Sequence, residues 1–217
     1  MSVEMIVLKD RDEWLQNRYN GIGGSEISAV VGCNPYLDNI TLWKIKTRQI
    51  EPDDISEKPY VKYGTNAEHH LRELFKLDFP EYMVEYIDNN SFKNSSYPWA
   101  LASVDGWLTD IDGRKGILEI KTTEILQSMQ KEKWNKQIPM NYYCQCLFYM
   151  AVLEADFCIL KAQLKTVYDG IPYLQTKHYK IERAEVQEDI DYLMAEGARF
   201  WGYVEARKMP PLKLPEI

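Results

Sequence analysis

The sequence has little that would hold a transition metal or a disulfide framework. Its three histidines are an adjacent pair, His69-His70, and a distant His178, a spacing that does not match a zinc site. Its four cysteines also lack the spacing of paired disulfides, which indicates a reducing cytoplasm. They are Cys33, Cys144, Cys146 and Cys158.

Long apolar runs are absent as well. No stretch approaches the roughly 20 apolar residues of a membrane-spanning helix, and Met1 to Trp14 carry charges where a signal peptide needs an apolar core. We therefore expect a soluble cytoplasmic protein with no membrane contact. With 217 residues, 45% of them apolar, the chain is long enough for one well-packed domain over residues 1–217.

Positive charge is in deficit. There are 26 Lys and Arg residues against 33 Asp and Glu, a formal net charge of −7, which excludes a protein that coats nucleic acid with its whole surface. Two local basic patches remain candidates, Lys44/Lys46/Arg48 and residues 130–136, where lysines surround Trp134 in a manner suited to phosphate contact and stacking. The alternative for both is a solvated helix face or loop.

Periodicity and turn residues predict a mixed α/β or α+β architecture. Helices are expected at 10–19, 26–31, 40–48, 60–79, 139–154 and 183–207, and strands at 83–87, 91–93, 107–120, 157–164 and 173–181. The helix at 139–154 is apolar almost all round and should be buried.

The segment 107–120 reads as a hairpin. Asp112-Gly113 favours the type I′ turn of a tight two-strand connection. Such a hairpin would bring Asp105, just before the first strand, beside Glu119 near the end of the second.

Strand alternation separates two kinds of side chain in the second strand. Leu118 and Ile120 face one way, while Glu119 and Lys121 face the other. Carboxylates in a cleft suit a hard divalent cation, and a neighbouring lysine can orient or deprotonate an attacking water. The alternative is ordinary charged decoration of a half-exposed strand.

Glu68 lies on the predicted helix 60–79, four residues after Gly64. If this helix packs on the sheet, Glu68 becomes a third carboxylate near the pair. The alternative is a surface glutamate paired with Arg72 at helical i,i+4 spacing.

The buried helix carries a polar residue that needs a partner. Gln145 and Tyr149 are four apart and share a face with Tyr142. Aromatic packing explains Tyr149, whereas a buried glutamine must find hydrogen bonds, which a catalytic cleft would supply.

A glycine-rich bend near the start of the chain separates Arg18 from Ser25. A guanidinium, a hydroxyl and the N–H groups of a helix start together make an anion site suited to phosphate. The alternative is a simple helix start.

Together these motifs resemble the YqaJ-type viral recombinase family, which is similar to phage lambda exonuclease within the PD-(D/E)XK nuclease superfamily. The resemblance covers roughly residues 18–149 and rests on the order of its motifs. They are Arg18…Gly23-Gly24-Ser25-Glu26, Gly64-x-x-x-Glu68, Ser103-Val104-Asp105-Gly106, Glu119-Ile120-Lys121 and Gln145-x-x-x-Tyr149. It implies a restriction-endonuclease-like core with a central mixed β-sheet flanked by helices. Val104 stands where the superfamily name has proline.

The resemblance implies a Mg²⁺-dependent exonuclease, with Mn²⁺ as a substitute, that degrades one strand of linear duplex DNA from its 5′ end. Asp105, Glu119 and the Ile120 carbonyl would bind the metal, and Glu68 would bind it directly or through water. Lys121 would position or activate the attacking water.

The same resemblance implies roles away from the metal. Gln145 and Tyr149 would support the active site and contact DNA, and Arg18, Ser25 and Ser103 would hold the 5′-terminal phosphate. It further implies a ring-shaped homotrimer that acts beside a single-strand annealing protein in phage-type recombination, within the host cytoplasm if the gene is phage-borne. A ring needs basic charge only in its channel.

Other readings share this core. One is a restriction-type endonuclease. Another is a RecB-like nuclease with an iron–sulfur cluster on one upstream and three downstream cysteines, although Cys144 and Cys146 flank Gln145 and should point to different sides of the helix. A third is a non-catalytic DNA-end-binding protein, which would usually have lost one of Asp105, Glu119 or Lys121.

Overall fold

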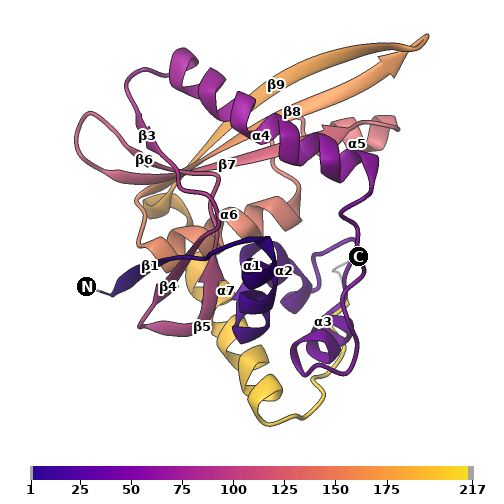
Figure 1. The fold of residues 1–217 in the computed structure, drawn as a ribbon, viewed down its shortest axis with the longest axis vertical. Coiled ribbons are helices and arrows are strands. Elements are labelled where there is room, and N and C mark those ends of the chain that lie inside the picture. The colour runs from indigo at the N-terminus through magenta and orange to yellow at the C-terminus, as the bar shows by residue number, and fades with distance from the viewer. Residues whose placement is uncertain (1, 215–217) are drawn as a thin grey trace.

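The structure, a computed structural model, describes residues 2–214 and has a mixed α+β fold (Figure 1). Helices flank two mixed sheets, so the predicted fold class is confirmed, but the strands divide between a five-stranded and a four-stranded sheet instead of forming one central sheet. Within residues 2–214, no helix combines the length and the apolar character that crossing a membrane requires.

The five-stranded sheet has the order β3-β6-β7-β8-β9. Its strands are β3 (Met83–Glu85), β6 (Gly106–Thr109), β7 (Lys115–Glu124), β8 (Phe157–Tyr168) and β9 (Ile171–Glu182). Only the β7–β8 pair is parallel, and helices lie between these two strands in the sequence, as a parallel crossover requires. β8 and β9 extend together beyond the rest of the molecule (Figure 1).

The four-stranded sheet has the order β1-β4-β5-β2. Its strands are β1 (Val3–Val7), β4 (Asn90–Asn94), β5 (Tyr97–Ala102) and the short β2 (Ile22–Gly23). β2 runs parallel to β5 and leads directly into a helix, so this sheet fixes where the glycine-rich bend lies.

Two helices lie on opposite faces of β7. α4 (Pro59–Asp78) begins with a proline at its first turn, where the missing N–H costs nothing. Its Leu71 and Phe75 are buried with Leu118 and Ile120 of β7, each such side chain contributing about 1.5–3 kcal/mol. α6 (Met140–Leu153) covers the other face, where residues 144–152 are all buried as predicted.

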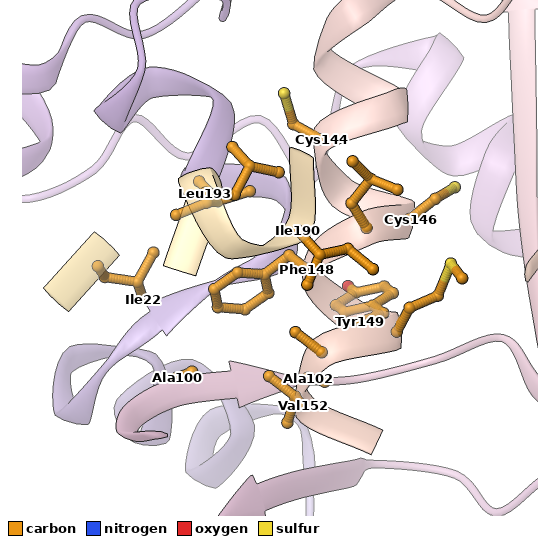
Figure 2. Packing of buried hydrophobic residues seen from close by; sticks show 14 of the residues in the cluster. Ile22, Ala100, Ala102, Cys144, Cys146, Phe148, Tyr149, Val152, Ile190 and Leu193 are labelled. Atoms are coloured by element: carbon orange, nitrogen blue, oxygen red, sulfur yellow. The ribbon is translucent and has the colours of Figure 1, made fainter. Parts of the chain in front are cut away.

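The larger core gathers around α6. Phe148 and Val152 of α6 belong to one buried cluster with Ile22 and with Ile190 of α7 (Arg183–Glu205) (Figure 2). The remaining helices are α1 (Arg11–Asn17), η1 (Arg18–Asn20), α2 (Gly24–Val30), α3 (Asn39–Lys46) and α5 (Ser128–Glu132). The predicted helix at 10–19 therefore ends earlier than expected and continues as one 3-10 turn.

The hairpin is present, but its predicted two-residue turn is wrong. Thr109 pairs with Lys115, so the connection has five residues, 110–114. The Asp110 carboxylate accepts hydrogen bonds from the Asp112 and Arg114 N–H groups, and Gly113 alone adopts a positive φ of 80°. A type I′ turn needs two residues with positive φ. The hydrogen bonds to the Asp110 side chain therefore determine the conformation of this connection.

Candidate active site

Asp105 and Glu119 lie side by side, as the hairpin predicts. Gly106 pairs with Leu118, which places the residue before β6 next to Glu119. The Asp105 Oδ2 atom accepts a 2.7 Å hydrogen bond from the Ile120 N–H, and Glu119 is 2% exposed. Two carboxylates are thus held together, one directly before the start of β6 and one in the middle of β7.

Both carboxylates are held in conditions that disfavour their charge. Burial raises the pKa of Asp105, and the nearby Glu119 and Glu68 raise it further. Burial also raises the pKa of Glu119, against the opposing effect of Lys121. Because their charged forms are disfavoured, these carboxylates would be stabilised strongly by a cation bound between them.

Lys121 provides one positive charge at this pair. Its Nζ lies 2.6 Å from Glu119 Oε1 and 5.3 Å from the Tyr142 ring centroid. Burial alone would lower the pKa of Lys121, but the Glu119 and Asp105 carboxylates raise it above its usual value. The lysine is therefore an ammonium group in the structure described here.

Gln145 uses its buried amide to position Glu119. The Gln145 Nε2 atom donates to Glu119 Oε1 at 2.6 Å and to the Tyr149 hydroxyl at 3.1 Å. The predicted shared face of Gln145 and Tyr149 is confirmed, and the partner that a buried glutamine needs is the carboxylate. The second oxygen, Glu119 Oε2, is buried without a hydrogen-bond partner among residues 2–214.

The donor set fits a magnesium ion. Mg²⁺ is typically held by one or two carboxylates and keeps several waters, and the buried Glu119 Oε2 has no hydrogen-bond donor within residues 2–214. Asp105, Glu119 and the Ile120 carbonyl are the groups that would hold it. Within the described residues, no three His, Cys, Asp or Glu side chains form a ready-made cage.

Glu68 stands beside this pair on α4 without joining it in a cluster. Its carboxylate accepts from Arg72 Nη1 at 3.2 Å, the i,i+4 pair considered as the alternative. Glu68 is thus paired with Arg72 and is also a third carboxylate near the pair, because its charge raises the pKa of Asp105 and of Glu119.

Arg72 is a site residue whose role the sequence did not reveal. Its buried guanidinium donates to the Asp105 carbonyl at 2.6 Å and stacks 3.5 Å from the Tyr86 ring centroid. It therefore ties α4 to the backbone of Asp105. The i,i+4 spacing from Glu68 was the available signal, but it does not predict a contact with residue 105.

Arg18 lies next to Ser25, and Trp14 contacts both Arg18 and Ser103. Arg18 Nη2 lies 3.4 Å from Ser25 Oγ and 2.9 Å from Glu26 Oε1. Trp14 Nε1 donates to Ser103 Oγ at 3.0 Å, and its ring centroid is 5.2 Å from Arg18 Cζ. Guanidinium and hydroxyl groups thus share one region between α1, α2 and the end of β5.

Lys46 is buried, so the predicted surface patch Lys44/Lys46/Arg48 is wrong. Its Nζ lies 2.7 Å from Glu26 Oε2 and donates to the Arg18 carbonyl, also at 2.7 Å. Burial favours a protonated Glu26, but Lys46 and Arg18 hold the pKa of this carboxyl at about 2. One buried carboxylate thus orients two cations.

In the second basic segment the predicted stacking role of Trp134 is wrong, because Trp134 is 2% exposed, whereas Lys131, Lys133 and Lys136 are exposed. Its ring stacks on Tyr142 with centroids 5.5 Å apart, and its carbonyl accepts from Lys177 and Tyr179 of β9. The tryptophan packs in the core and is not available to stack on a base.

Gly24 and Tyr149 join the two halves of the site. A Cβ at Gly24 would lie 2.2 Å from Tyr149 Cε1, so the start of α2 contacts the tyrosine ring directly. Burial raises the pKa of Tyr149, with Glu119 adding to the effect, so its hydroxyl stays neutral. Tyr149 therefore lies between the Arg18 region, which consists of Arg18, Ser25 and Ser103, and the Asp105/Glu119 carboxylate pair.

The cysteines lie in two pairs. Burial and the nearby Cys33 raise the pKa of Cys144 to about 12. A hydrogen bond with Cys146 and burial raise the pKa of Cys158. The alternation predicted for Cys144 and Cys146 is thus confirmed, and no three of these thiols converge within the described residues.

The fold places the chain among exonuclease structures. It superposes on the alkaline exonuclease LHK-Exo from Laribacter hongkongensis with a TM-score of 0.65 at 18% identity, over 90% of this chain and 93% of that one. A phage-related exonuclease from Haemophilus somnus 129PT gives a TM-score of 0.58 at 13% identity, over 89% and 99%. The class defined here is an exonuclease fold with a paired-carboxylate and lysine site.

The chain belongs to the family of YqaJ-like viral recombinase domains, whose model matches residues 13–156. It is also similar to the uncharacterized protein YqaJ of Bacillus subtilis (strain 168), with 30% identity over 191 residues. That match covers 88% of this chain and 55% of the relative, so the chain spans about half the length of YqaJ. The family resemblance found in the motifs is confirmed.

Proposed function

We propose that the protein is a Mg²⁺-dependent deoxyribonuclease that degrades one strand of linear duplex DNA in the 5′-to-3′ direction. The observation that carries the proposal is the buried Glu119 Oε2 beside Asp105 and Lys121, which has no hydrogen-bond partner in the part of the chain that the structure describes. Family membership and the exonuclease fold support phosphodiester hydrolysis as the reaction.

Each residue of the pair has a defined task in this proposal. Asp105, Glu119 and the Ile120 carbonyl would hold Mg²⁺, with Glu68 reached through water. A bound Mg²⁺ would supply charge stabilisation at the scissile phosphate and a lower pKa for the attacking water. Mn²⁺ has similar oxygen-ligand preferences and is the expected substitute.

The lysine and the amide act on the reacting groups. In the structure, Lys121 neutralises the carboxylate charge. With a metal bound to the carboxylates, Lys121 Nζ would be released to orient the attacking water and to stabilise the negative charge that develops on the phosphate. Gln145 would keep Glu119 in one rotamer, and Tyr149 would hold the amide in place.

The direction of degradation rests on the Arg18 region. We assign Arg18, Ser25 and Ser103 to the 5′-terminal phosphate, supported by the guanidinium and hydroxyl groups that gather there. A solved complex of LHK-Exo contains dAMP, with a TM-score of 0.64, 17% identity and coverage of 90% of this chain and 93% of that one. For this chain, mononucleotide release is part of the proposal.

The wider setting follows from the same proposal. Residues 1–217 would act as one nuclease domain that assembles as a homotrimer and works with a single-strand annealing protein in phage-type recombination in the cytoplasm. A ring would confine the DNA to one channel, which reconciles DNA binding with a formal net charge of −7.

The test uses linear duplexes with and without 5′ phosphate and a covalently closed circle, each with Mg²⁺ or chelator. We expect mononucleotide release from the linear phosphorylated duplex and none from the circle or with chelator. Cutting of the closed circle would replace the exonuclease assignment with an endonuclease. Binding of ends without digestion would leave a DNA-end-binding protein.

A further inference from the structure

Two guanidinium groups share one tryptophan at the start of the molecule. Arg11 Cζ lies 4.2 Å from the Trp14 ring centroid, and Arg18 Cζ lies 5.2 Å from the same centroid. The spacing of three and then four residues brings the three side chains to one side of α1 and η1. Asp10 caps α1 through the Glu13 N–H at 2.9 Å and so fixes where this arrangement begins.

The two arginines differ in their partners. Arg18 is paired with the buried Glu26 at 2.9 Å. Arg11 is exposed and forms no ion pair or side-chain hydrogen bond within residues 2–214. One of the two positive charges therefore has no ion-pair partner among the described residues, which is the condition in which an anion from outside binds most favourably.

The electrostatic neighbours of Arg11 locate it between the two parts of the site. Partial burial and repulsion from Arg18 lower the pKa of Arg11, whereas Glu68 raises it. Arg11 thus lies within electrostatic reach of Arg18 on one side and of Glu68 on the other. A 5′-terminal nucleotide that spans these two parts would pass it.

We propose that Arg11 is a second guanidinium for the 5′-terminal phosphate, held on Trp14 and acting together with Arg18. This inference rests on the proposed function and adds a binding residue to it. Arg18, fixed by Glu26 and close to Ser25, provides the oriented donor, and Arg11 provides a guanidinium that forms no ion pair within residues 2–214. A guanidinium stacked on an indole keeps its N–H edge free for phosphate oxygens.

The test measures binding without cleavage. A fluorescent duplex with a 5′ phosphate or a 5′ hydroxyl is titrated with protein in chelator, for the wild type and for Arg11→Gln. We expect the wild type to bind the phosphorylated end at least several-fold more tightly and Arg11→Gln to lose most of that preference. The slope of log K against log salt should also fall by about 1, the value for one lost phosphate contact.

Two further variants make the result specific. Arg207→Gln removes another exposed guanidinium, two residues after the end of α7, and should keep the full end preference. Arg11→Lys keeps the charge without the planar group and should restore part of it. Because Arg11 is exposed, its variants are expected to unfold at the wild-type temperature.

The outcomes separate this inference from the proposed function. If Arg11→Gln keeps the wild-type preference, or weakens both kinds of end equally, Arg11 does not bind the terminal phosphate. A wild type that shows no preference overturns the inference as well. Failure of the proposed function appears in a different measurement, as the absence of Mg²⁺-dependent digestion by the wild type.

Discussion

Arg72 Nη1 lies 2.6 Å from the carbonyl oxygen of Asp105, and the same nitrogen is 3.2 Å from Glu68 Oε1. One buried guanidinium therefore sets the position of a proposed metal-binding residue through its backbone and of a second carboxylate through its side chain. Residues around a metal site that act in this way commonly change metal affinity 10–100-fold when they are removed.

Replacement of Arg72 by methionine should weaken both the fold and the metal site. The Asp105 carbonyl would lose its donor, which costs about 1–3 kcal/mol of unfolding free energy, and the Mg²⁺ concentration for half-maximal activity should rise about 10-fold or more. Urea unfolding and a Mg²⁺ titration of activity measure the two effects. Lys76→Gln, on the exposed side of the same helix, should change neither.

Mg²⁺ should stabilise the fold more as the pH rises. Burial and repulsion from neighbouring carboxylates raise the pKa of Asp105 and Glu119, so the metal-free folded state holds protons that the unfolded chain has released. The metal-free fold consequently loses stability as the pH rises above the unfolded carboxyl range near 4. Mg²⁺ competes with those protons and binds better at higher pH.

The corresponding measurement is the thermal unfolding midpoint at pH 5 and pH 8, with Mg²⁺ and with chelator. A Mg²⁺ concentration 100 times the dissociation constant adds about 2.7 kcal/mol. Glu119→Gln should remove most of this gain at both pH values. An equal gain in this variant would place the metal elsewhere.

Glu26 should make the fold acid-sensitive in a defined range. Lys46 and Arg18 hold its folded pKa at about 2, below an unfolded value of 4.5. A carboxyl whose pKa is depressed on folding contributes stability above its unfolded pKa, and this is lost as the pH falls towards 2. The contribution at pH 7 is on the order of 3 kcal/mol.

Unfolding free energies between pH 7 and pH 2.5 test this for the wild type and Glu26→Gln. The variant should be less stable at pH 7, and the difference should shrink as the pH falls through the range from 4.5 towards 2. Glu188→Gln, at an exposed position on α7, should follow the wild type. A difference that stays constant with pH would mean that the Glu26 charge is not the stabilising element.

Two glycines should respond to alanine in opposite directions. A Cβ at Gly24 would meet the Tyr149 ring at 2.2 Å, so Gly24→Ala must displace α2 or the tyrosine and should lower both stability and activity. Gly202, within α7, has no atom within 4 Å of the added carbon, so Gly202→Ala should stabilise the protein by about 0.4–1 kcal/mol. Chemical unfolding of both variants provides the comparison.

The sequence predicted those parts of the site that depend on local rules. Strand alternation placed Glu119 and Lys121 on the face opposite Leu118 and Ile120, and helical spacing placed Gln145 above Tyr149. Both hold in the structure, because neither depends on a distant partner.

The rest depended on tertiary contacts that no local pattern encodes. Lys46 appears in the sequence as part of a basic run, yet its side chain is buried because it forms an ion pair with Glu26 on α2. Trp134 appears among lysines as a stacking residue, but it packs on Tyr142. The division of the strands into two sheets likewise depends on pairing between residues far apart in the chain.

Release of mononucleotides from a linear 5′-phosphorylated duplex, followed with Mg²⁺ for the wild type, Lys121→Ala and Glu119→Gln, tests the central claim most directly. Labels placed on the 5′ or the 3′ end identify the end from which nucleotides leave. The account predicts Mg²⁺-dependent release that begins with the 5′ label in the wild type, and loss of at least 100-fold in both variants, roughly the effect of removing one transition-state group. Undiminished release by either variant, or initial release of the 3′ label, would contradict it.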